Sequence, residues 1–218
     1  MKRFTVFFCT CVALMAGLSN CKKKNEGGSS ANFFPLSTGS TWTYKENVAN
    51  VTYVYTSTGR DTTISGRGYK VISNSIGPNV YSTQVGSDYF RYGALNTGLS
   101  SAGIEELFLK DNLAVNGTWS TQQNVTYNGT NYVLNLNYRI LEIAASKTFN
   151  GRTYNNVIGV NLDIATTVSG FSVVLGNGKF YYANGIGMVR NELAINPPAG
   201  AGLPNISQNT DLLTYTIR

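Results

Sequence analysis

The side chains that could do chemistry in this chain are carboxylates, hydroxyls and amines, because the sequence contains no histidine. Without an imidazole, Ser–His triads and most zinc sites are excluded, and Ser–Lys, carboxylate-pair or tyrosine chemistry is left. From residue 31 onward neither a Ser-x-x-Lys sequence nor a Gly-x-Ser-x-Gly nucleophile elbow occurs. Glu105 and Glu106 would project to opposite faces of a strand, so they could not form a glycosidase pair with each other. A pair from distant strands, such as Asp88 with Asp163, stays open, but we expect no enzyme.

Oxygen ligands for a hard cation occur at Asp61 and at Asp111-Asn112. Calcium takes six or more oxygen ligands, usually from acidic residues at alternate positions of a loop. Neither segment has that spacing, and we interpret both as turn residues on the surface. The sequence therefore predicts neither a metal nor another cofactor.

Aromatic side chains are plentiful, with 14 Tyr, 10 Phe and 2 Trp. Tyr and Trp join a flat apolar face to a polar group, which suits contacts with sugars, peptides or lipids. The alternative is that they fill the core of a sheet, where aromatic residues are favoured. We assign Trp42 and Trp119 to the core, and the residues that we single out as candidate ligand contacts are Tyr89, Tyr92, Tyr181 and Tyr182.

The formal net charge of +6 overstates how basic the body of the chain is. Five of the Lys and Arg residues lie within the first 24 positions, and from Ala31 onward 12 Lys or Arg face 10 Asp or Glu. Nucleic-acid binding needs a clustered basic surface. We therefore expect no nucleic-acid partner.

The N-terminus has the layout of an export signal. Met1-Lys2-Arg3 is basic, and residues 4–18 are uncharged and mostly apolar, short of the ~20 residues that span a bilayer. The sequence Leu18-Ser19-Asn20-Cys21 resembles a lipobox, the processing site of bacterial lipoproteins, with Asn20 where that pattern has Gly or Ala. This resemblance implies removal of the signal peptide 1–20 and acylation of Cys21 with diacylglycerol and a fatty acid such as palmitate.

The lipobox resemblance also implies which cysteines remain in the mature protein and where the protein is located. Cys9 and Cys11 would be removed with the signal, so no thiol would remain for a disulfide or for catalysis. The Lys- and Gly/Ser-rich residues 21–31 would form a flexible tether. The expected location is the outer membrane of a Gram-negative envelope, with the membrane as partner through lipidated Cys21 and the periplasmic or cell-surface face left open.

Two phrases in the mature chain resemble a set of Bacteroidetes-type lipoproteins. The first runs from Phe34-Pro35-Leu36 through Gly39 to Trp42 and Tyr44, and the second is Tyr181-Tyr182-Ala183 followed by Gly185, Gly187 and Val189. The resemblance spans most of the mature chain and implies no known activity.

Alternation of apolar and polar residues dominates the rest of the chain. Residues 132–140 and 158–164 alternate with a period of two, which predicts antiparallel strands with one buried face. Asn128-Gly129 predicts a tight hairpin, and Gly176-Asn177-Gly178 predicts a second one. Residues 212–217 predict a closing strand, whereas 101–110 fit a helix or a strand. The predicted fold is all-β: an antiparallel sheet that is strongly curled or closed into a barrel, with a β-sandwich as the alternative.

We expect a single all-β domain over residues 32–218. Short phrases recur in the same order in its two halves, 32–110 and 111–218, which suggests an internal repeat. Chance similarity in a chain rich in Tyr, Gly and Thr is the alternative. The recurring pairs are 36–42 with 113–119, 66–69 with 151–154, and 88–93 with 179–185.

Two functions of different class fit these features. One is a non-catalytic binding or carrier module that holds a small apolar or sugar ligand against aromatic side chains. The other is a structural or assembly lipoprotein that docks another envelope protein through sheet edges or the segment 196–204. A concave cavity lined by Tyr and Phe would favour the first, and a filled core with a flat exposed apolar patch would favour the second.

Overall fold

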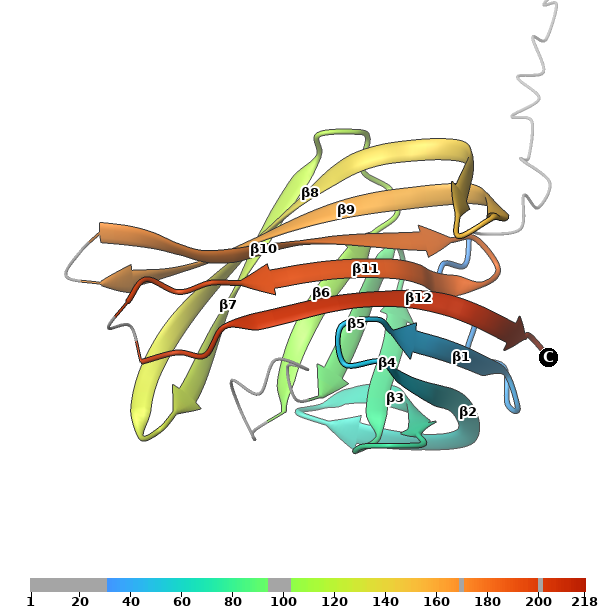
Figure 1. Ribbon diagram of the computed structural model, residues 1–218. Coiled ribbons are helices and arrows are strands. Elements are labelled where there is room, and N and C mark those ends of the chain that lie inside the picture. Colours follow the sequence, from blue (N-terminus) through green and yellow to red (C-terminus); the bar gives the residue numbers. More distant parts are fainter. Residues whose placement is uncertain (1–30, 94–102, 169–170, 200–201) are drawn as a thin grey trace, which may run out of the picture. The chain divides into compact units, whose positions relative to one another are not determined.

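The computed structural model describes residues 31–93, 103–168, 171–199 and 202–218, which belong to one compact unit, Ala31–Arg218. The described residues form twelve strands joined in one antiparallel sheet (Figure 1). The strands are β1 (Thr41–Glu46), β2 (Val51–Ile64), β3 (Arg67–Asn74), β4 (Val80–Val85), β5 (Asp88–Gly93), β6 (Ile104–Lys110), β7 (Thr118–Tyr127), β8 (Thr130–Phe149), β9 (Arg152–Val168), β10 (Phe171–Ala183), β11 (Gly187–Ile195) and β12 (Ile206–Thr216).

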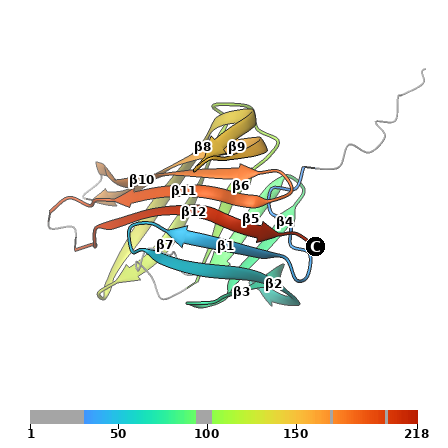
Figure 2. The same cartoon turned by 45° about the vertical axis from the view of Figure 1, so that its right-hand side comes forward.

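The sheet is two six-stranded meanders joined through β1 and β12. Its strand order is β6-β5-β4-β3-β2-β1-β12-β11-β10-β9-β8-β7, so β6 and β7 are the two edges. The sheet curls until these edges face each other, and the result is a nearly closed barrel (Figures 1 and 2). The all-β, strongly curled fold predicted from the sequence is confirmed, and the β-sandwich alternative is not what forms.

Side chains connect the two edge strands where no backbone ladder joins them. The indole Nε1–H of Trp119 on β7 donates to the Leu107 carbonyl of β6 over 2.8 Å, and the Gln123 amide donates to the Glu105 carbonyl. Unpaired carbonyls on a sheet edge invite pairing with other chains. These two donors satisfy alternate carbonyls of β6 and hold the seam together.

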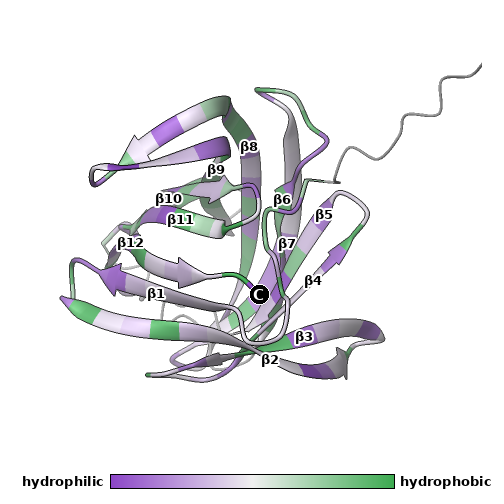
Figure 3. Ribbon diagram, turned by 90° about the vertical axis from the view of Figure 1, so that its right-hand side faces the viewer, coloured by the Kyte–Doolittle hydropathy of each residue, from purple (hydrophilic) through white to green (hydrophobic). Residues whose placement is uncertain are grey.

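Strand alternation places the core inside the barrel. Leu134, Leu136, Tyr138 and Ile140 of β8 are buried, whereas the residues between them are more exposed. Apolar and polar residues alternate along the strands, as the hydropathy colouring shows (Figure 3). Because successive strand residues point to opposite faces, one face of each strand fills the interior.

The two glycine-containing hairpin predictions have different outcomes. Asn128-Gly129 is the turn between β7 and β8, with positive φ values of 48° and 78°, so that prediction is confirmed. The hairpin at 176–178 is wrong, because these residues lie within β10. A Cβ at Gly176 would lie 2.2 Å from the Ala194 carbonyl oxygen, so this glycine permits close approach of β11 at a bulge.

The remaining local predictions fall on strands. Residues 104–110 form β6, while 101 and 102 lie outside the described residues. The predicted closing strand is part of β12, which begins earlier, at Ile206.

Two of the three recurring sequence pairs occupy corresponding positions in the two meanders, and the third does not. Trp42 and Trp119 are each the second residue of a first strand, β1 and β7. Residues 66–69 and 151–154 lie at the β2–β3 and β8–β9 turns, which also correspond. The third pair falls on β5 and β10, which do not correspond. The internal repeat stays a prediction.

The two ends of the barrel differ. The turns β2–β3, β4–β5, β8–β9 and β10–β11 gather at one end with residues 31–40, and we call this the closed end. There Phe34 stacks on Trp42 with ring centroids 6.0 Å apart, and the Trp42 indole donates to the Ile186 carbonyl. The opposite end, where β1–β2, β3–β4, β7–β8 and β11–β12 connect, we call the open end.

Candidate ligand-binding cavity

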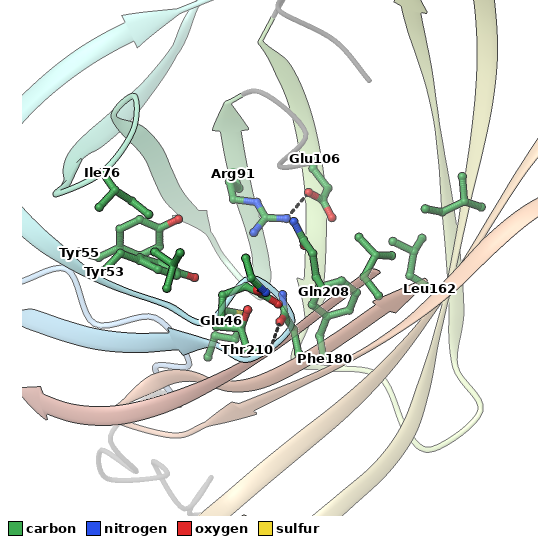
Figure 4. Close-up of a pocket in the computed structure, with 16 residues that line it drawn as sticks. Glu46, Tyr53, Tyr55, Ile76, Arg91, Glu106, Leu162, Phe180, Gln208 and Thr210 are labelled. Atoms are coloured by element: carbon green, nitrogen blue, oxygen red, sulfur yellow. Dashed lines mark hydrogen bonds and ion pairs between the residues drawn. The ribbon is translucent and has the colours of Figure 1, made fainter. Parts of the chain in front are cut away.

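A cavity of about 280 Å3 occupies the barrel interior toward the open end (Figure 4). Its volume is at the lower bound of ligand pockets, about 300–1,000 Å3. Strands from both meanders supply its wall, so the cavity depends on the curl of the whole sheet. The apolar and aromatic part of the lining is Tyr53, Tyr55, Leu162, Ile164, Phe180, Met188 and Leu193.

Tyr53 and Tyr55 form one aromatic wall because both lie on the same face of β2. Their ring centroids are 5.2 Å apart, and Tyr44 of β1 packs against both, at 5.5 and 5.6 Å. Burial raises the pKa of Tyr53 above its usual value, and the neighbouring Tyr55 adds to this. The Tyr53 phenol is therefore neutral at physiological pH.

An ion pair stands in the cavity wall. Arg91 of β5 and Glu106 of β6 point toward one another, with Nη2 and Oε2 2.5 Å apart (Figure 4). The second carboxylate oxygen of Glu106 accepts a 2.8 Å hydrogen bond from the Tyr138 hydroxyl of β8. The Glu106 side chain is 6% exposed and that of Arg91 37%. Because Arg91 lines the cavity, its accessible part faces the interior space.

The electrostatics of this triad follow from burial and proximity. Burial alone would lower the pKa of Arg91, but the Glu106 carboxylate outweighs it and the pKa is raised. Burial and the same carboxylate raise the pKa of Tyr138. Arg91 is thus fixed as a cation and Tyr138 as a neutral donor, and the carboxylate joins β5, β6 and β8 across the seam.

Arg91, together with Tyr55 and Met188, lines both the main cavity and a smaller space of about 30 Å3 nearer the closed end. Phe34, Tyr44, Phe108 and Tyr182 line that space. It is about the volume that one water molecule occupies in the liquid. Arg91 therefore lies at the floor of the usable cavity.

Glu46 stands at the opposite side, near the mouth. Its carboxylate accepts backbone N–H groups of Val48, Ala49 and Asn209, which fixes the β1–β2 turn against β12. The slight burial of Glu46 acts to raise its pKa, but these backbone hydrogen bonds outweigh it and the pKa is lowered. The mouth therefore carries a fixed negative charge.

The rim of the open end combines large exposed apolar side chains with the Glu46 carboxylate. The described connecting residues at this end, 47–50, 75–79, 128–129, 196–199 and 202–205, contain no Lys, Arg, Asp or Glu. Large apolar side chains are exposed on the described strand ends and turns around it. They are Val48, Val51, Ile76, Val133, Phe171 and Val174.

The four tyrosines predicted from the sequence are not brought together. Tyr89 is buried at the closed end, where its hydroxyl contacts the Ala31 carbonyl, the Asp111 carboxylate and the Phe33 N–H. It therefore secures the N-terminal segment to β5.

The other three tyrosines also lie away from the main cavity. Tyr92 packs against Tyr69 and Tyr81, on the face of β5 opposite to Arg91. Tyr181 packs against Phe149 at the end of the β8–β9 hairpin, with ring centroids 4.8 Å apart. Tyr182 lines only the smaller space, and burial raises its pKa.

The sequence reading missed the residues that do line the cavity. Tyr53 and Tyr55 carry a period-two signal that could have placed them on one face. Arg91 interrupts an aromatic strand, and Glu106 an apolar one, which is the usual mark of a paired inward charge. The sequence did not reveal that the pairing of β5 with β6 places these two charges side by side.

The carboxylate predictions can be placed as well. Glu105 and Glu106 do face opposite ways, since Glu105 binds Arg67 and the Tyr69 hydroxyl. Asp88 pairs with Lys110 over 2.7 Å on β5 and β6, and Asp163 is exposed on β9, which neighbours neither strand. Among the described residues, no three His, Cys, Asp or Glu side chains lie close enough to hold a metal ion.

No family model, curated protein or solved structure matches this chain. Cys21 and residues 21–30 of the predicted tether lie outside the described residues. In the part of the chain that the structure describes, no helix has the length and apolarity that crossing a membrane requires.

Proposed function

We propose that this protein is a non-catalytic binding or carrier module that holds a small, mostly apolar ligand inside the barrel. The observation that carries the proposal is the cavity of about 280 Å3, lined by Tyr53, Tyr55 and Phe180 and reached from the open end. An evolved core is normally packed to near crystal density. A space this large in a sheet with many large side chains is suited to a guest molecule.

We further propose that the module is held on the outer membrane by acylated Cys21. The support is the lipobox-like sequence, together with the route of the chain into the barrel. Asn32 exchanges hydrogen bonds with the β10–β11 turn, through the Asn184 side chain and the Gly185 N–H, so the chain enters at the closed end. The tether would then leave the mouth free. Replacing Cys21 with Ala should release the protein from the membrane fraction, and retention there would contradict the anchor.

The binding proposal is tested by what the protein carries. The full chain is purified from its native membrane, extracted with organic solvent, and the extract is analysed by mass spectrometry. Leu193→Trp fills the cavity and should abolish the co-purifying molecule. Thr167→Trp, at an exposed position of β9, is the matched control and should retain it. A molecule that survives Leu193→Trp in a folded protein, or no molecule at all, would count against the proposal.

A second candidate is a structural or assembly lipoprotein that docks another envelope protein. The observation in its favour is the rim, where Phe171 is 76% and Val174 66% exposed. Contiguous exposed apolar side chains often mark interaction sites. The same purification separates the two functions, because docking predicts a protein partner that is lost when Phe171 and Val174 are replaced by Ser and kept in Leu193→Trp.

A further inference from the structure

The charges that line the cavity leave no spare positive charge for a ligand. Arg91 is the one cation among the described lining residues, and Glu106 neutralises it at 2.5 Å. The remaining charged lining residue is Glu46, a carboxylate at the mouth. The cavity therefore carries a neutral ion pair at its floor and a net negative charge at its entrance.

Ions are costly to place in such a space. Transfer of an unpaired charge into an apolar interior is strongly unfavourable, whereas a hydroxyl, ester or amide needs only a hydrogen-bond partner. Arg91 offers N–H donors on a planar guanidinium, and the Tyr53 and Tyr55 phenols flank the same space. The polar part of a guest can thus be satisfied without bearing a charge.

The residues around the mouth independently indicate that the cavity favours uncharged ligands. Charged ligands are commonly steered to their sites by charged residues around the entrance. Here the described connecting segments of the open end contain no charged residue, and Val51 and Ile76 at the entrance are apolar side chains that also line the cavity. Such an entrance favours partition of an apolar molecule and provides no attraction for an anion.

We infer that the cavity selects uncharged amphiphiles, with an apolar body among Leu162, Phe180 and Leu193 and a neutral hydrogen-bonding group at Arg91, and that it rejects anions. This inference rests on the proposed binding function and specifies its ligand. It separates a neutral alcohol, ester or amide from a fatty-acid anion of the same length.

The test uses two fluorescent probes with the same anilinonaphthalene rings. N-phenyl-1-naphthylamine is uncharged, and 8-anilino-1-naphthalenesulfonate carries a sulfonate. Titration of the full chain at neutral pH should show the uncharged probe binding at least about tenfold more tightly, which corresponds to about 1.4 kcal/mol. Equal or tighter binding of the sulfonate would overturn the selectivity while leaving the binding function standing. Failure of both probes to bind would count against the binding function itself.

Glu106→Gln provides the decisive variant. Glutamine keeps acceptor capacity for Tyr138 but leaves the Arg91 charge uncompensated, so the affinity for the sulfonate relative to that for the neutral probe should rise about tenfold over wild type. Glu105→Gln removes the adjacent charge on the opposite face and should alter neither affinity. An unchanged relative affinity in folded Glu106→Gln would overturn the inference.

If Glu106→Gln does not fold, Glu46→Gln removes the other negative charge from a more exposed position. It should raise the affinity for the sulfonate relative to that for the neutral probe severalfold. A relative affinity that stays at the wild-type value would overturn the inference.

Discussion

The ion pair inside the barrel should make Glu106 one of the carboxylates on which the stability of the described unit depends most. Glu106→Ala removes the partner of Arg91 and the acceptor of the Tyr138 hydroxyl in one step. Removing one member of a buried pair costs about 3–5 kcal/mol, because the other charge is left unpaired. The Arg91 side chain reaches the cavity and is 37% exposed, so water can solvate it in part and the lower half of that range applies.

We therefore expect Glu106→Ala to lower the free energy of unfolding by about 3–4 kcal/mol. In a unit of this size each kcal/mol lowers Tm by about 2–4 °C, so the shift should be about 6–16 °C. The assay is thermal and urea unfolding followed by circular dichroism. Glu105→Ala is the matched control, because its pair with Arg67 is about one-third exposed, and this pair together with the hydrogen bond from the Tyr69 hydroxyl should contribute about 1–2 kcal/mol.

The double variant Arg91→Met with Glu106→Leu tests whether the unpaired Arg91 charge causes the loss of stability in Glu106→Ala. Replacing both charges removes the unpaired cation, so it should recover most of the stability lost in Glu106→Ala. The reasoning would be refuted if Glu106→Ala cost no more than Glu105→Ala, or if the double variant were less stable than the single one.

Three further predictions concern the seam, the closed end and pH. Trp119→Phe removes the indole donor to the Leu107 carbonyl and should cost about 1–3 kcal/mol in urea unfolding; an unchanged midpoint would show that the seam does not depend on it. Tyr89→Phe removes the hydroxyl that holds Ala31, and should speed amide hydrogen exchange at residues 32–34 while leaving β8 protected. Burial, then the hydrogen bond to Glu105, raises the pKa of Tyr69 to about 12, so its contribution to stability should be intact below pH about 10 and fall as pH rises from 10 to 12, because the unfolded phenol loses its proton first. The tyrosinate absorbance that Tyr69→Phe removes from the folded protein should therefore appear near pH 12, and its appearance at pH about 10 would contradict this.

The fold was predictable because its signals are local. The alternation of apolar and polar residues over 132–140 predicted a strand, and Asn128-Gly129 predicted the turn before it. Both features are set by residues close together in the sequence, so they can be recognised without the tertiary structure. The prediction failed at Gly176, where the glycine serves an approach of β11 that no local pattern reveals. A glycine in a strand has several structural uses, and only tertiary context separates them.

The sequence predicted the type of site but not the residues that form it. The high tyrosine content indicated a space lined by aromatic side chains. The tyrosines that we singled out from short sequence motifs do not line the cavity, however, and Tyr89, for example, packs at the closed end of the barrel. The cavity is built from β1, β2, β5, β6 and β9 to β12, so its lining is set by the curl of the sheet and not by any short segment. The pairing of Arg91 with Glu106 likewise depends on the β5–β6 register, which aligns these two residues.

The claim that a ligand binds within the barrel is tested most directly by methyl-resolved NMR during titration with N-phenyl-1-naphthylamine. The account predicts saturable shifts for Leu162, Ile164, Met188 and Leu193, which line the cavity. It predicts no shift for Ile143, which is 53% exposed and does not line it. Shifts confined to Val133 and Val174 on the rim, or none at all, would contradict it.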